Sequence, residues 1–68
     1  MYIKFNDKDN TILNTNNIRS VFCKREFSEL IYLYFICISY ENGEKYNLIY
    51  HEKEERDKDY EHIKNVLL

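Results

Sequence analysis

The chain has 68 residues, of which 10 are Lys or Arg and 12 are Asp or Glu, so its net charge at pH 7 is −2. A chain this short forms one domain, residues 1–68, and buries only about 60% of the surface that its unfolded state exposes. The slightly acidic balance argues against a general nucleic-acid binder, because such proteins gain much of their affinity by neutralising phosphates. Two cysteines are too few for the disulfide framework of a small secreted domain.

The N-terminal stretch MYIKFNDKDN has no basic region followed by an apolar run, so it does not read as a secretory signal. The longest uncharged run, LIYLYFICISY at residues 30–40, is shorter than the roughly 18–20 apolar residues of a membrane-spanning helix. We therefore expect a cytoplasmic protein without a membrane anchor. Residue types with AT-rich codons (Phe, Tyr, Met, Ile, Asn and Lys) dominate the composition, which favours an AT-rich bacterial, phage or plasmid genome and hence a bacterial host cell.

The first half of the chain reads as short strands separated by polar turns. Residues 2–5 alternate in polarity and predict a first strand, the sequence NDKDN at residues 6–10 predicts a turn, and residues 11–14 predict a second strand. The sequence NTNN at residues 14–17 predicts another turn, because Asn tolerates the left-handed conformation. A third strand follows over residues 18–26 and leads through EFSEL into the long apolar run.

The sequence ENGE at residues 41–44 predicts a hairpin between strands at residues 31–40 and 45–50, with Asn42 and Gly43 as a two-residue type I′ loop. This loop would place Tyr40 opposite Lys45 and Ile36 opposite Ile49. Side chains alternate between the two faces of a strand. One predicted face therefore carries Leu33, Phe35, Cys37, Ser39, Tyr46, Leu48 and Tyr50. The other carries Tyr32, Tyr34, Ile36, Ile38, Tyr40, Lys45, Asn47, Ile49 and His51.

The C-terminal run EKEERDKDYEHIKNVLL predicts one helix, which begins near residues 52–54 and continues to the end of the chain. Its apolar residues at helical spacing are Tyr60, Ile63, Val66 and Leu67. The first two turns have no apolar stripe, so we expect them to project into solvent. The predicted fold is α+β: a small antiparallel meander of about five strands with the C-terminal helix packed on one face.

Both faces of the predicted sheet are largely apolar, whereas a single helix covers only one of them. The sequence does not indicate which face the helix covers. One apolar face therefore remains open in either arrangement.

No group of residues predicts catalysis or metal binding. The soft metal ligands Cys23, Cys37, His51 and His62 lack the close pairs that build a zinc site, and a Cys23–Cys37 disulfide does not fit the expected strand register. The single glycine belongs to the hairpin, so there is no glycine-rich phosphate loop. We expect no enzyme activity, no cofactor and no metal.

The seven tyrosines favour an interaction surface, because tyrosine combines a large apolar body with a polar tip and is enriched at interfaces. We predict a non-enzymatic module that binds another protein by steric docking, after forming a homodimer or small homo-oligomer. Its most specific form is an inhibitor of a host machine encoded by a phage or mobile element, of the anti-CRISPR kind. The residues predicted for partner binding are Tyr32, Tyr34, Ile36, Ile38, Tyr40 and Ile49.

Two alternatives stay open. The first is a regulatory or nucleic-acid-associated module that uses Arg19, Lys24 and Arg25 with neighbouring aromatic residues, since stacking on aromatic rings beside basic groups is how proteins hold single strands. The second is a purely structural homo-oligomer, in which the open face of the sheet meets its twin across a two-fold axis.

Overall fold

The computed structural model describes residues 2–5 and 11–67, and over these residues it confirms an α+β fold of antiparallel strands followed by one helix. The elements are β1 (Tyr2–Lys4), β2 (Ile12–Asn14), β3 (Ile18–Ser28), β4 (Ile31–Tyr40), β5 (Lys45–Tyr50) and α1 (Lys53–Leu67). The turn predicted at residues 6–10 lies outside the described residues.

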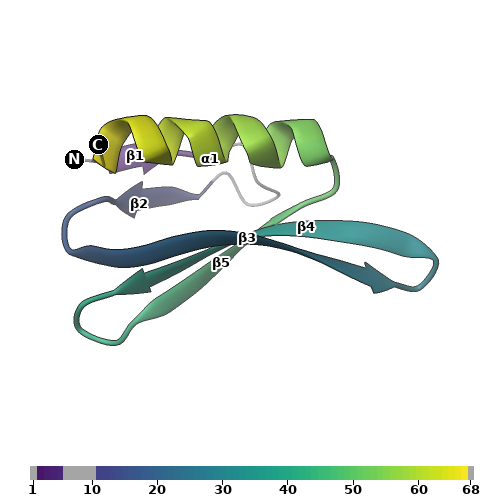
Figure 1. Cartoon of the computed structure of the whole chain (residues 1–68), viewed down its shortest axis with the longest axis horizontal. Coiled ribbons are helices and arrows are strands. Elements are labelled where there is room, and N and C mark those ends of the chain that lie inside the picture. The colour runs from purple at the N-terminus through teal and green to yellow at the C-terminus, as the bar shows by residue number, and fades with distance from the viewer. Residues whose placement is uncertain (1, 6–10, 68) are drawn as a thin grey trace.

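The five described strands form two sheets rather than one continuous meander. β1 and β2 make a two-stranded sheet, and β3, β4 and β5 make a three-stranded sheet with β4 in the centre. The small sheet and α1 lie on the same side of the large sheet (Figure 1). Asn17 turns the chain between the two sheets with a φ of 64°, and the hydroxyl of Tyr40 donates to the carbonyl oxygen of Asn14 at 2.6 Å. These two features fasten the small sheet over the large one.

The predicted register between β4 and β5 is wrong by one residue. The loop has three residues, because the N–H of Tyr40 donates to the carbonyl of Glu44 (2.8 Å) and the N–H of Gly43 donates to the carbonyl of Tyr40 (3.0 Å). Gly43 has a φ of 93°, whereas Asn42 is not among the residues with positive φ. This pattern is a type I turn followed by a left-handed glycine, and not the predicted type I′ loop.

The change of register moves every β5 side chain to the other face of the sheet. Ile36 now pairs with Leu48 and Tyr34 with Tyr50, so Leu48 and Tyr50 share a face with the β4 isoleucines. Ile49 instead pairs with Phe35 on the opposite face. Tyr46, Leu48 and Tyr50 of β5 thus lie on the same face as Ile36 and Ile38 of β4.

That face forms the core, and α1 and the small sheet cover it. The small sheet supplies Ile3 and Leu13, and Phe5 follows directly after β1. The large sheet supplies Ile36, Ile38, Leu48 and Tyr50, and the helix supplies Ile63. Partly buried residues, among them Tyr34, Tyr40 and Tyr60, surround this cluster.

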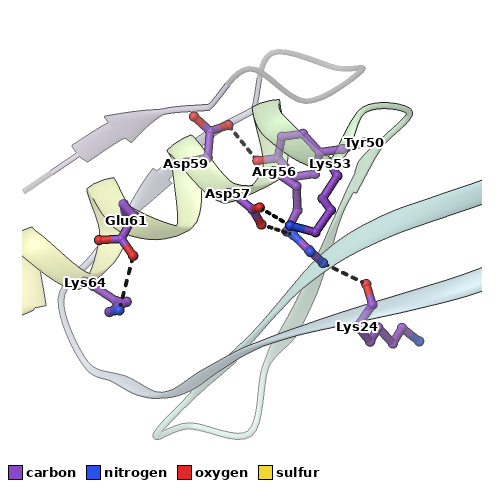
Figure 2. A network of polar contacts seen from close by, with 8 residues as sticks. All are labelled: Lys24, Tyr50, Lys53, Arg56, Asp57, Asp59, Glu61 and Lys64. Atoms are coloured by element: carbon purple, nitrogen blue, oxygen red, sulfur yellow. Dashed lines mark hydrogen bonds and ion pairs between the residues drawn. The ribbon is translucent and has the colours of Figure 1, made fainter.

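The first turns of α1 contact the sheet, which corrects the prediction that they project into solvent. Arg56 and Asp59 are buried. The hydroxyl of Tyr50 donates to Oδ2 of Asp59 at 2.7 Å, and Nη1 of Arg56 donates to the carbonyl of Lys24 at 3.2 Å (Figure 2). Polar contacts thus hold the N-terminal half of the helix, and apolar contacts through Ile63 hold the C-terminal half.

Candidate docking surface

The six residues predicted for partner binding do not form one surface. Ile36 and Ile38 are fully buried, and Tyr34 and Tyr40 are partly buried beside them. Ile49 is partly exposed on the opposite face, because the register differs by one residue from the prediction. Of the six, only Tyr32 is well exposed on the side of the sheet that carries the helix.

The structure gathers the exposed apolar side chains at the end of the β3–β4 hairpin instead. β5 pairs with β4 only from Tyr34 to Ser39, so the hairpin continues beyond the sheet as a two-stranded ribbon. It also extends past the helix (Figure 1). We call its end the hairpin tip; it consists of Phe27, Leu30, Ile31 and Tyr32, which are 61%, 89%, 50% and 47% exposed.

The turn of the hairpin tip adopts an unusual backbone conformation. Ser28 pairs with Ile31, so Glu29 and Leu30 form a two-residue loop, and their φ angles are 50° and 68°. Both are in the left-handed region, as a type I′ turn requires. This conformation costs an ordinary L-residue roughly 1–2 kcal/mol, which is why Asn-Gly is usual there. The most exposed large apolar side chain of the described residues thus occupies a strained position.

Aromatic contacts hold the ribbon behind the turn. Phe27 and Tyr32 face each other across the strands with ring centroids 4.9 Å apart and an interplanar angle of 52°. Cζ of Arg25 lies 4.6 Å from the centroid of the Tyr32 ring, on the same face of the ribbon. Contacts between a guanidinium and an aromatic ring are worth about 0.5–1 kcal/mol at exposed sites. The hairpin tip is therefore an apolar end with the guanidinium of Arg25 beside it and the exposed carboxylate of Glu29 in its turn.

The residues of the nucleic-acid alternative do not share a face. Arg25 pairs with Tyr34 on the helix side of the sheet, whereas Lys24 lies on the other side, with Nζ 4.9 Å from the centroid of Phe35. Lys24 also forms an ion pair with Glu26 at 3.1 Å. Arg19 lies at the opposite end of β3, beside a register irregularity. Because neighbouring strand residues alternate sides, the cluster seen in the sequence is divided in space.

The two cysteines are free thiols on opposite faces of the large sheet, since Cys23 pairs with Ile36 and Cys37 pairs with Phe22. Burial raises the pKa of both thiols, so neither resembles an activated nucleophile. Within residues 2–5 and 11–67, no group of three His, Cys, Asp or Glu side chains is arranged so that it could hold a metal ion. Over the same residues, no helix is long and apolar enough to cross a bilayer.

Two other ionisable groups are perturbed by their surroundings. Burial raises the pKa of the Tyr40 hydroxyl. A hydrogen bond from Nζ of Lys53, at 2.6 Å, lowers the pKa of Asp57, and contact with Arg56 acts in the same direction. Both groups have structural partners within the fold, and neither lies at the hairpin tip.

Sequence reasoning missed Phe27, Leu30 and Ile31 as candidate functional residues. A signal for them was present: the turn between the third and fourth strands contains no glycine, asparagine or proline, yet apolar residues lie on both sides of it. A tight hairpin without a favoured turn residue indicates that other requirements decide its sequence.

Searches against protein-family models, curated proteins and solved structures find no match to this chain.

Proposed function

We propose that this chain is a non-enzymatic module that binds another protein by inserting the hairpin tip into an apolar pocket. The single observation that carries the proposal is Leu30, which is 89% exposed at a position with a φ of 68°. Residues with a strained backbone cluster at functional sites, where the position of the side chain matters more than stability. An exposed leucine at a strained position therefore supports a role in binding.

The side chains of the hairpin tip indicate what kind of surface the partner presents. Leu30 and Ile31 are aliphatic and suit a dry pocket, while Phe27 and Tyr32 supply rigid aromatic contact area around it. Arg25 beside Tyr32 favours carboxylates at the rim of that pocket. A two-stranded ribbon is only marginally stable in water by itself, so a partner that covers it would also stabilise it.

The experiment is affinity capture from the native host, followed by quantitative mass spectrometry, with wild type and two folded variants as bait. The test variant is Glu29→Asn/Leu30→Gly, which is expected to keep the type I′ turn and removes the exposed leucine together with the carboxylate of Glu29. The control is Ile12→Ser, which removes an exposed apolar side chain from β2. We expect at least one protein that the wild type and the control retain and the turn variant loses. Identical protein sets from all three baits would refute the proposal.

The more specific form of the proposal is an inhibitor encoded by a phage or mobile element that occludes a host machine. It is supported by the small size and the AT-rich codon usage implied by the composition. The identity of the protein captured through the hairpin tip tests it directly.

A further inference from the structure

β3 is an edge strand of the large sheet, and its outer edge has no neighbour among the described strands. It has 11 residues, none of which is buried, whereas the central strand β4 has four buried residues. The other edge strand of this sheet, β5, has only 6 residues. An edge strand presents a row of backbone N–H and C=O groups that can pair with another strand. The outer edge of β3 is therefore the longer of the two rows that the large sheet presents.

The register shows which backbone groups point to this edge. The N–H of Tyr40 donates to Glu44, on the β5 side of β4. Because successive residues of an antiparallel strand direct their backbone groups to alternate sides, every second β4 residue counted from Tyr40 bonds to β5, and the others bond to β3. The β3 residues that pair with the first set direct N–H and C=O to the outer edge; they are Val21, Cys23, Arg25 and Phe27. No other described segment supplies hydrogen-bond partners to these groups.

Most of β3 lacks the usual protection of an edge strand. Natural edges are protected by proline, by bulges or by charged side chains. β3 contains no proline, and its register irregularity lies within its first three residues. Its central charged side chains lean over β4 and away from the open edge. Nζ of Lys24 lies 4.9 Å from the ring centroid of Phe35, and Cζ of Arg25 lies 4.6 Å from that of Tyr32.

A groove beside this edge has room for a side chain. It has a volume of about 300 Å³ and lies between the start of β3 and the C-terminal half of α1. Its lining combines apolar groups from both elements with one cation from each: Val21, Tyr60, Ile63, Leu67, Arg19 and Lys64. Lys64 is paired with Glu61 at 3.2 Å, whereas Arg19 has no acidic partner among the described residues. The groove therefore suits an apolar side chain with a carboxylate nearby.

We propose that β3 binds an extended segment of another protein, which adds a fourth strand to the large sheet along residues 20–25. In this mode of recognition, main-chain hydrogen bonds hold the segment and pockets for alternate side chains select its sequence. An apolar side chain of the segment enters the groove, and an Asp or Glu of the segment pairs with Arg19. This surface is separate from the hairpin tip, and the inference does not depend on the function proposed for that tip.

The charge of β3 favours a different chain over a second copy. The strand has three cations and one anion, which give it a net charge of +2, whereas that of the whole chain is −2; these residues are Arg19, Lys24, Arg25 and Glu26. Two copies paired edge to edge would set this positive strand against itself, and like charges on facing strands are destabilising. An acidic segment is attracted by the same charges.

The experiment begins with selection from a phage library of random linear peptides, with the full chain as bait. We expect the selected peptides to share an apolar residue and an Asp or Glu. One selected peptide is synthesised in three forms: unmodified, N-methylated at its odd residues, and N-methylated at its even residues. Because only every second N–H of an added strand faces β3, one methylated form should bind about tenfold or more weakly, and the other should bind like the unmodified peptide. Fluorescence anisotropy measures the affinities.

Variants of the protein locate the contact, and circular dichroism verifies that each one folds. Cys23→Pro removes an N–H from the outer edge, where a strand tolerates proline, and Cys23→Val is the matched control that keeps this N–H. We expect binding that is about tenfold or more weaker for Cys23→Pro and for Arg19→Glu. Cys23→Val should bind like the wild type.

Four outcomes would overturn the inference: a selection that enriches no peptide, equal binding of the two methylated forms, full binding by both Cys23→Pro and Arg19→Glu, or a wild type that dimerises through this edge in sedimentation. The methylated peptides decide the question even if Cys23→Pro does not fold, because they leave the protein unchanged. None of these variants alters the hairpin tip, so failure of this inference is distinguishable from failure of the proposed function.

Discussion

The hydrogen bond between Tyr50 and Asp59 shows how a single polar contact can decide the position of an element. Both residues are nearly inaccessible to solvent, and the hydroxyl of Tyr50 donates to Oδ2 of Asp59 at 2.7 Å. A hydrogen bond to a charged group contributes about 1.5–3 kcal/mol, more than a neutral one. The bond therefore fixes the N-terminal half of α1 over the end of β5.

Replacement of Tyr50 by Phe tests this contact. We expect the free energy of unfolding to fall by about 1.5–3 kcal/mol, because one charge-assisted bond is lost from a buried site. Urea denaturation measures the change. Tyr46→Phe is the matched control: its hydroxyl donates to Glu44 at 3.3 Å in an exposed site, so the expected change is within about 0.5 kcal/mol. Equal effects of the two variants would contradict this account of the helix.

The cysteines provide a second test at the scale of residues. Burial raises the pKa of both Cys23 and Cys37, so each holds less thiolate at neutral pH than an unperturbed thiol does. We expect the native protein to react more slowly with iodoacetamide than the urea-unfolded chain, and Cys37, which is buried, to react more slowly than Cys23. Mass spectrometry of the alkylated peptides reports both rates. Native thiols that react as fast as unfolded ones would refute the burial of these side chains.

At the scale of elements, both hairpins of the large sheet have loop residues with positive φ, but the residue types at these positions differ. The β4–β5 loop contains Asn42 and Gly43, and its glycine takes the left-handed position with a φ of 93°. The β3–β4 loop places Glu29 and Leu30 in that region. The favoured Asn-Gly sequence is thus present in the β4–β5 hairpin and absent from the β3–β4 hairpin, which extends beyond the sheet. This difference supports a role for Leu30 outside the stability of the fold.

Exchange of the turn residues tests the strain. Glu29→Asn/Leu30→Gly should raise the free energy of unfolding by about 1 kcal/mol, since Asn and Gly adopt positive φ more easily and glycine only partly offsets this through the entropy of the unfolded chain. Gly43→Leu should lower it by about 1–2 kcal/mol, because its backbone needs the left-handed region although the space around it is open. Thermal and urea denaturation measure both. A destabilised turn variant would show that the loop is not strained.

At the scale of the whole molecule, the two faces of the large sheet differ in what covers them, because α1 and the small sheet lie on one face only (Figure 1). Ile36 is fully buried beneath the helix, whereas Phe22 on the other face is half exposed. The same substitution on each face should therefore produce different effects. A charge in the core remains without solvation, but a charge on the other face stays hydrated.

We expect Ile36→Asp to unfold the domain, because its cost exceeds about 4 kcal/mol and approaches the whole stability of a small protein. Phe22→Asp should keep the native circular dichroism spectrum, because its side chain is already half exposed to water. Circular dichroism and urea denaturation of the two variants, compared with the wild type, measure these effects. A folded Ile36→Asp protein would contradict the assignment of this face to the core.

Much of the fold is predictable from the sequence, because local patterns determine it. The order of the strands, the helix from Lys53 and the antiparallel pairing of the large sheet all follow from polarity, turn residues and helical spacing. Local sequence patterns do not predict which face of the sheet the helix covers. It depends on a loop that is one residue longer than predicted, and a change of one residue exchanges the two faces of β5.

The candidate site is less predictable than the fold. The tyrosine composition indicates a binding surface, but the residues selected from β4 include Ile36 and Ile38, which are buried in the core. Leu30, Ile31 and Phe27 become candidates only when the lengths of β3, β4 and β5 are compared. The hairpin is exposed because the pairing of β5 with β4 ends at Tyr34, so the first residues of β4, Ile31 to Leu33, pair with β3 alone.

By itself, the sequence determined the class of the fold and the apolar central strand, since these depend on interactions between residues close in the chain. Only the tertiary structure decided the register of β5, the burial of Arg56 and Asp59, and the exposure of the hairpin tip. The physical reason is that small energy differences in one loop, together with packing between elements distant in the chain, select among arrangements that the same local pattern permits.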